Sequence, residues 1–137
     1  MEIEVKLFGM DSLGSRNCNG RIYTEDVLKN AIDRWEHSNK TCRVGFENVT
    51  KSEDGPNIAL KDTAGKVNDI FIKDKSAFAK IELLDTPQGK MAKELIGSGY
   101  DMKFALSGTG DCDTIIDEDG KESVIVRNFN INSVGAF

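Results

Sequence analysis

The chain has 137 residues and a formal net charge of −5, from 23 acidic and 18 basic residues. Hydrophobic residues make up 39% of it, enough to build a core, so wholesale disorder is excluded and one domain spanning residues 1–137 is expected. The acidic balance argues against a nucleic-acid partner. A membrane partner is not expected, since no apolar run approaches the ~18 residues of a span and the N-terminus lacks a signal-peptide pattern.

The cysteines are Cys18, Cys42 and Cys112, an odd number with no closely spaced pair. A disulfide framework or a zinc site needs paired or clustered cysteines. Reduced thiols, partly buried, are therefore the favoured interpretation. We expect no metal and no cofactor.

In the first third of the chain, residues 2–8 alternate polar and apolar side chains, which predicts a half-buried strand. Residues 9–20 are rich in glycine, serine and asparagine and predict a long loop. Thr24 then caps a helix that ends near His37, with acidic residues in its first turn. The face of that helix expected to pack against a sheet consists of Val27, Leu28, Ala31, Ile32 and Trp35.

Residues 42–46 are a short strand candidate. Residues 47–65 are polar and predict a loop around one short ordered piece at residues 58–60. Two alternating runs, residues 67–72 and 77–84, predict the clearest hairpin in the chain.

The second helix is predicted to begin with Thr86 as its cap and Pro87 as its first residue, and to close at Gly97 and Gly99. Its expected buried stripe consists of Met91, Ala92, Leu95 and Ile96.

Residues 104–106 predict a short apolar strand. A further hairpin is expected from residues 114–116 and 123–131, joined by the acidic turn 117–121. Because hairpins dominate, the pattern predicts an α+β fold, with a mostly antiparallel bent sheet or β-barrel core and two main helices.

Several motifs carry little chemistry on their own. The acidic turn at 117–121 fails the ligand spacing of a calcium loop and is better interpreted as a solvated hairpin turn. Residues 108–110, Gly-Thr-Gly, form only a fragment of a nucleotide-binding pattern and predict flexible turn glycines. His37, the one histidine, is expected to be exposed at a helix end.

Ser107 follows the apolar strand and precedes the glycine-rich turn, where its hydroxyl can point outward as a candidate nucleophile. Judged alone, an ordinary turn serine is the better interpretation. In the 17–24 segment, Asn-Gly suggests a tight turn, and Arg21 is expected to clamp the loop through hydrogen bonds.

Taken together, however, the motifs resemble a known family, the prohead core proteases of tailed phages. Residues 17–24, Asn-Cys-Asn-Gly-Arg-Ile-Tyr-Thr, are similar to the family opening N-x-N-G-R-x-Y-P. Residues 65–71 resemble its next strand, and residues 81–90 its L-d-T-P-x-G-k segment. Residues 95–99 match the helix end before the catalytic strand.

The last two motifs complete the resemblance, which spans roughly residues 17–137. Residues 105–110, Ala-Leu-Ser-Gly-Thr-Gly, fall where the family has G-V-S-S-R-G, and residues 133–137 resemble its closing S-D-P-A-F. Ser107 occupies the nucleophile position. The residues that carry the structural motif are Asn17, Asn19, Gly20, Arg21, Thr86, Pro87, Gly89 and Gly110.

The resemblance implies a fold like that of the herpesvirus assemblins, and a role in phage head morphogenesis. In active relatives a serine and a histidine base cleave scaffold and capsid proteins. Here the stretch that matches the family's histidine segment, residues 44–50, contains no histidine. A serine hydroxyl without its base is a poor nucleophile at neutral pH.

The sequence therefore favours a non-catalytic structural protein of a tailed-phage head, such as a decoration, cement or minor capsid protein. Such a pseudoenzyme would be made in the host cytoplasm and bind the major capsid protein or the scaffold, with copies able to associate on the capsid. One alternative is a maturation protease in which Ser107 works with an unusual base. A second is an assembly regulator or anti-host factor that reuses the fold.

Overall fold

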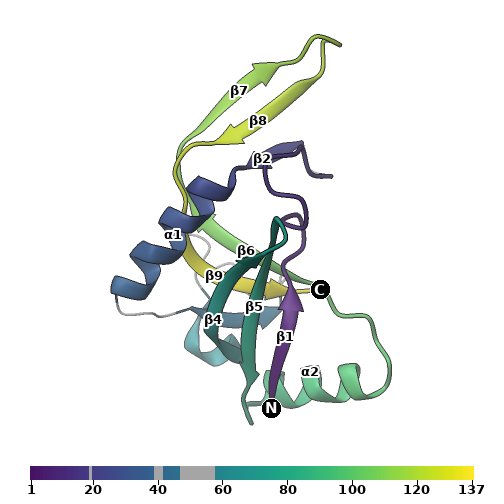
Figure 1. Ribbon diagram of the computed structural model, residues 1–137. Helices are drawn as coiled ribbons and strands as arrows, with labels where there is room; N and C mark the ends of the chain where they lie inside the picture. The colour runs from purple at the N-terminus through teal and green to yellow at the C-terminus, as the bar shows by residue number, and fades with distance from the viewer. Residues whose placement is uncertain (19, 39–41, 47–57) are drawn as a thin grey trace.

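The computed structural model describes residues 1–18, 20–38, 42–46 and 58–137. Two helices and a strongly bent sheet make an α+β fold, as predicted (Figure 1). The main sheet has six strands in the order β1-β5-β4-β3-β9-β6. Their bounds are β1 Glu2–Lys6, β3 Arg43–Phe46, β4 Gly65–Lys73, β5 Ser76–Leu83, β6 Phe104–Thr109 and β9 Asn130–Ala136.

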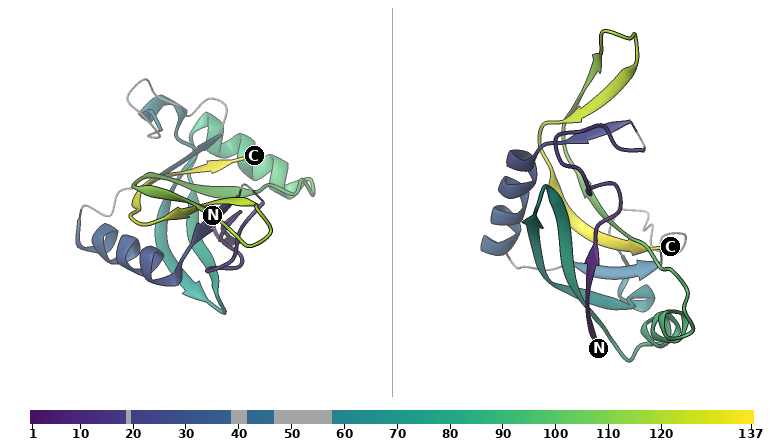
Figure 2. Two further views of the ribbon diagram at one scale, coloured as in Figure 1. Left: turned by 90° about the horizontal axis from the view of Figure 1, so that it is seen from above. Right: turned by 45° about the vertical axis from the view of Figure 1, so that its right-hand side comes forward.

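The main sheet curls until its first and last strands meet. Leu7, just after β1, forms a parallel bridge with Phe104 of β6, and the Phe8 N–H donates to the Phe104 carbonyl at 2.8 Å. The side chains that line the interior, among them Leu7, Val44, Ile81 and Val134, are fully buried. The predicted bent sheet with a barrel-like core is confirmed, and the curl is plain in Figure 2.

Helix α1, Glu25–His37, packs against β4 and β9. The Thr24 hydroxyl accepts from the Val27 N–H at 3.3 Å, which is the predicted N-cap. Of the predicted apolar face, Leu28, Ala31 and Trp35 are buried, and the other two residues are partly buried against the same core. Both ends of this helix were therefore correctly predicted.

Strands β4 and β5 form the hairpin that the alternating pattern predicted. The two residues at its tip, Asp74 and Lys75, have positive φ angles of 52° and 61°, which suits a tight two-residue hairpin turn. Upstream of it, the predicted ordered piece is present, because Ile58 is buried and a short 3-10 helix spans Leu60–Asp62. Most of the predicted polar loop, residues 47–57, lies outside the described residues.

Helix α2, Pro87–Gly97, begins with the predicted threonine and proline. The Thr86 hydroxyl accepts from the Gly89 N–H at 3.0 Å and donates to the Thr63 carbonyl at 2.7 Å. A Cβ at Gly89 would lie 2.0 Å from the Leu84 carbonyl oxygen, so only glycine lets the helix approach the end of β5 this closely.

The predicted buried stripe of α2 is wrong at Met91, which is 54% exposed. Ala92 is buried, while Leu95 and Ile96 are only partly covered. The reason is that α2 contacts the rest of the protein through the small residues Gly89 and Ala92. The side of the helix that carries Met91 therefore faces solvent. Gly99, with φ 91°, follows the helix in the left-handed conformation of a C-terminal cap, whereas Gly97 is the last helical residue.

A second, three-stranded sheet has the order β2-β8-β7. Strand β2 spans Arg21–Tyr23, β7 spans Cys112–Ile116 and β8 spans Glu122–Val126. The predicted hairpin is therefore present, and its turn at 117–121 is held by the Asp117 carboxylate, which accepts from two backbone N–H groups. Figure 1 shows β7 and β8 projecting from the body of the molecule.

The single strand predicted over residues 123–131 is wrong, because the chain leaves one sheet and enters the other at residues 127–129. Phe129 is buried there, with its ring edge-on to Tyr23 at 5.7 Å. Of the strand that follows, β9, only the first two residues fall within that predicted strand. Its last four residues are buried on both faces, so the strand lacks the alternation by which a half-buried strand is recognised.

In the described parts of the chain, no helix is both long and apolar enough to cross a membrane. The three cysteines are free, and Cys42 alone among them is buried, whereas Cys18 and Cys112 are exposed. The sequence had predicted partly buried thiols in general, and only one of the three fits.

We predict that Gly89→Ala destabilises the protein by more than about 2 kcal/mol, because the added methyl group would overlap backbone that cannot easily move. Urea unfolding followed by circular dichroism measures the change. Gly97→Ala is the matched control on the same helix, since nothing lies within 4 Å of a Cβ there. We expect that control to change stability by between zero and about +1 kcal/mol. Equal effects of the two substitutions would contradict the close-packing explanation.

A second prediction concerns the Cys42 thiol, whose pKa burial raises from the ordinary value of 9.0 to about 12. Only the unfolded chain ionises this thiol between those two values, so its contribution to stability is present below pH 9 and is lost as the pH rises toward 12. Urea unfolding of the wild type and of Cys42→Ala at pH 7 and pH 10.5 checks this. The free energy of unfolding should fall less between the two pH values in the variant than in the wild type.

The accessibility of the thiols gives a further prediction. In the native protein at about pH 8, a thiol reagent should titrate Cys18 and Cys112 and leave Cys42 unmodified until denaturant is added.

Candidate functional site

Ser107, the candidate nucleophile, lies on strand β6 and points to the outer face of the curled sheet. It alternates with Leu106, which is buried in the core, and is itself half-buried. Directly opposite on β9 is Ser133, which is 3% exposed. The pairing of the two strands shifts immediately after this position, which marks an irregularity beside Ser107.

The turn that was predicted to follow Ser107 is not there, because β6 continues to Thr109. Gly108 is not a flexible turn glycine: a Cβ on it would lie 2.1 Å from the Asn130 carbonyl oxygen and 2.7 Å from the Phe129 ring. Gly110 is equally confined, at 1.9 Å from the Asn128 carbonyl oxygen. Both glycines allow the chain after Ser107 to lie closely against the segment that leads into β9.

Strand register aligns Ser107 with a row of polar residues that crosses all six strands of the main sheet. Each member is paired with the next, from β6 through β9, β3, β4 and β5 to β1. We call this set the polar row; it consists of Ser107, Ser133, Arg43, Lys66, Glu82 and Glu2. The sequence alone did not reveal it, since its members come from six separate segments.

Beyond Ser133, the polar row carries two basic residues, Arg43 and Lys66, and then two acidic ones, Glu82 and Glu2. Arg43 is half-buried and donates from Nη1 to the Ile58 carbonyl at 2.9 Å. The next two members form an exposed ion pair, with Lys66 Nζ 3.3 Å from Glu82 Oε2. Along the polar row, Ser107 is thus followed by a hydroxyl and, one strand further, by a guanidinium. A guanidinium stays protonated and a neutral hydroxyl is a very weak base, so neither can take the proton of Ser107.

His37, the one imidazole in the chain, lies in the last turn of α1. Its side chain is 77% exposed, and Nδ1 lies 2.8 Å from the carbonyl oxygen of Asp33. The backbone hydrogen bond with Asp33, together with the carboxylate of that residue, raises the pKa of His37. Helix α1 packs on the core, whereas Ser107 faces outward, and the helix ends at the left of Figure 1, away from β6. The prediction of an exposed histidine at a helix end is confirmed.

The stretch that matches the family's histidine segment begins on β3. Val44 points into the core and Gly45 pairs with Gly135 of β9. The remaining residues of the segment, 47–50, lie outside the described residues.

The asparagine-rich motif at 17–24 forms a loop anchored by Asn17. Its Nδ2 donates to the Gly9 carbonyl at 3.1 Å, and its Oδ1 accepts from the Arg21 N–H at 2.9 Å. Gly20 turns the chain with a φ of 74° and donates to the Asn17 carbonyl. The expected clamp by Arg21 is corrected: its side chain is exposed, and the hydrogen bonds it makes with described residues use its backbone. Asn19 lies outside the described residues.

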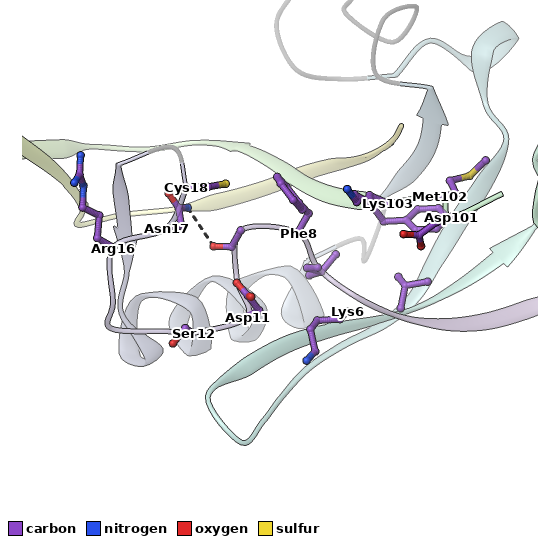
Figure 3. Close-up of a pocket in the computed structure, with 14 residues that line it drawn as sticks. Lys6, Phe8, Asp11, Ser12, Arg16, Asn17, Cys18, Asp101, Met102 and Lys103 are labelled. Carbon is purple, nitrogen blue, oxygen red and sulfur yellow. Dashed lines mark hydrogen bonds between the residues drawn. The ribbon is translucent and has the colours of Figure 1, made fainter.

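The same loop borders a pocket of about 690 Å³ that sequence reasoning missed (Figure 3). It lies at the Leu7–Phe104 bridge, between the end of β1 with the loop that follows it and residues 101–104, which lead into β6. Phe8 forms one wall, with its ring edge-on to Phe137 at 5.2 Å and Lys103 Nζ 5.7 Å from the ring centroid. Ser107 is not among the residues that line this pocket.

A metal centre finds no support in the described residues, where no group of three or more histidine, cysteine or acidic side chains could hold an ion. In the 117–121 turn, the Asp117 carboxylate instead accepts two backbone hydrogen bonds, as suits the solvated turn that was predicted.

Comparison with known proteins supports the fold. The chain is similar to the solved structure of the bacteriophage T4 capsid assembly protease, gp21, with a TM-score of 0.75. The match covers 98% of this chain and 80% of that chain, at 19% sequence identity. No protein-family model matches the sequence, and no curated protein matches it either. At this identity the likeness establishes a shared fold, which is the fold that the motifs had implied.

We predict that Asn17→Ala destabilises the protein by about 1–3 kcal/mol, because it removes the side chain that joins Gly9 to Arg21 and leaves their backbone groups unpaired. Arg21→Ala is the control in the same loop and should stay within about 0.5 kcal/mol of the wild type. Thermal and urea unfolding of the two variants measures both values. A larger loss for the arginine variant would restore the clamp first expected from the sequence.

Proposed function

We propose that this chain is a non-catalytic structural protein of a tailed-phage head, built on the prohead protease fold. The observation that carries the proposal is the separation of Ser107 from the single imidazole of the chain. Ser107 has a hydroxyl and then a guanidinium as its neighbours along the polar row, while His37 is exposed at the end of α1. The fold similarity to a capsid assembly protease supports the setting in head assembly.

The reactivity expected of a serine without an adjacent base favours loss of proteolysis. A serine hydroxyl becomes an effective nucleophile when an adjacent base removes its proton, and removal of a catalytic-triad member typically lowers the rate by several orders of magnitude. The pocket at the end of β1 does not include Ser107 in its lining, so it does not serve as a substrate site for that hydroxyl. A protein that binds a repeated capsid or scaffold surface needs shape and contact groups, and the fold supplies these without a working nucleophile.

One alternative is a maturation protease that uses Ser107 with an unusual base, such as an imidazole donated by another subunit. The observation in its favour is that Ser107 lies on the outer face of the sheet, half-buried beside a strand irregularity, at the position that the family's nucleophile motif assigns to it. Under this alternative, cleavage of scaffold and capsid proteins would depend on the Ser107 hydroxyl.

The test is to incubate the protein with the scaffold and major capsid proteins of the phage that encodes it, with Ser107→Ala beside it. We expect no cleavage by either variant, with identical fragment patterns by mass spectrometry, because no base activates the hydroxyl. Serine-dependent fragments would overturn the non-catalytic proposal and establish the protease.

The site of action is tested separately on purified mature particles. Quantitative mass spectrometry should find the chain in the head at a fixed stoichiometry to the major capsid protein. If the chain is absent from the particles and from their assembly intermediates, the structural role is wrong, even when cleavage is also absent.

A further inference from the structure

The hairpin of β7 and β8 stands away from the body and exposes one whole strand. We call residues 111–127 the arm; Figures 1 and 2 show it extending beyond the curled sheet. All five residues of β7 are exposed. The inner strand, β8, pairs with β7 on one side and with β2 on the other, so β7 forms the edge of the three-stranded sheet.

Backbone hydrogen bonds fix which groups of β7 point outward. The Arg127 N–H donates to Asp111 at 2.8 Å, and the Asp117 N–H donates to Lys121 at 3.0 Å, one pair at each end of the ladder. In an antiparallel ladder, pairs that exchange hydrogen bonds alternate with pairs that do not. The N–H and C=O groups of Asp113 and Ile115 therefore face β8, and those of Cys112, Thr114 and Ile116 face away from it.

This outward edge lacks several of the features that usually protect an exposed strand. Edge strands are commonly blocked by lysine, proline or a bulge. Strand β7 contains no lysine or proline, and its register with β8 runs unbroken over all five residues. It also exposes two isoleucines, Ile115 at 41% and Ile116 at 68%. The edge thus offers backbone groups and apolar side chains to an incoming strand.

Charge indicates what kind of strand fits. The arm has six carboxylates and two basic residues, a net charge of −4 out of −5 for the whole chain. One of the carboxylates, Asp113, is already paired with Arg127 at 2.8 Å, whereas most of the others cluster at the turn. Pairing of two copies of this arm would place two net charges of −4 side by side. The repulsion disfavours self-pairing, and the same charge favours a cationic partner.

We propose that β7 is a docking edge that receives, by strand addition, an extended basic segment of a partner protein. The backbone groups of Cys112, Thr114 and Ile116 would pair with the segment, and its lysines or arginines would lie near the acidic turn. This inference stands apart from the proposed head function, because the arm includes no residue of the polar row.

The experiment uses the full chain and a short synthetic peptide of alternating lysine and valine, with a glutamate–valine peptide as the charge control. Fluorescence anisotropy measures binding to the wild type and to two variants at one position. Thr114→Pro removes an N–H that points away from β8, so the hydrogen bonds between β7 and β8 remain. Proline is tolerated at such positions of edge strands. Thr114→Val keeps both the N–H and the β-branched shape.

We expect the lysine peptide to bind the wild type and Thr114→Val alike, to bind Thr114→Pro at least about tenfold more weakly, and to bind less well as salt is added. Amide hydrogen exchange should slow at Cys112, Thr114 and Ile116 when the peptide binds. In Thr114→Pro, persistently slow exchange at Asp113 and Ile115 shows that the hairpin is intact.

Four results would overturn the proposal. The first is equal peptide binding by the proline and valine variants. The second is binding of the glutamate peptide as tightly as the lysine peptide. The third is slowed amide exchange confined to residues outside β7. The fourth is a dimer, seen by sedimentation without peptide and abolished by Thr114→Pro, which would make a second copy the occupant of the edge.

Discussion

The arrangement of the molecule depends on the burial of β9 between β3 and β6. This strand runs parallel to β3 and antiparallel to β6, and its last four residues are covered on both faces. With Val134 fixed in the core, its neighbour Ser133 must face outward, because successive side chains of a strand point to opposite faces. The register of this one strand therefore places Ser107 and Arg43 on either side of Ser133.

The fold shared with a capsid assembly protease depends on packing contacts of this kind. The closed curl of the sheet, the cap on α2 and the close approach at Gly89 are requirements of packing. None of them needs a base beside Ser107. The fold is stabilised by these contacts, whereas catalysis would depend on a few side chains. A protein can therefore lose catalytic activity and keep the fold.

Charge is unevenly distributed between the body and the arm. With −4 on the arm, the remaining residues together carry only −1. The rest of the protein is thus nearly neutral. The negative electrostatic potential is concentrated on a hairpin that contributes little to the core. Val126 is the one residue of the arm in the buried core, whereas β7 presents an open strand edge, an arrangement suited to recognition.

The sequence by itself determined the elements whose signals are local. Thr24 and Thr86 mark helix starts because a side-chain oxygen satisfies backbone donors a few residues away, and the hairpin of β4 and β5 follows from alternation on one half-buried face. The family motifs likewise led to the correct fold class.

Tertiary structure alone decided where those elements meet. Most of strand β9 escaped prediction because burial on both faces removes alternation. Gly108 was mistaken for a turn residue because its confinement comes from Phe129 and Asn130, which are distant in the chain. Met91 is exposed because α2 approaches β5 through Gly89. The polar row arises in the same way, since strand register brings together side chains whose spacing along the chain carries no signal of their proximity.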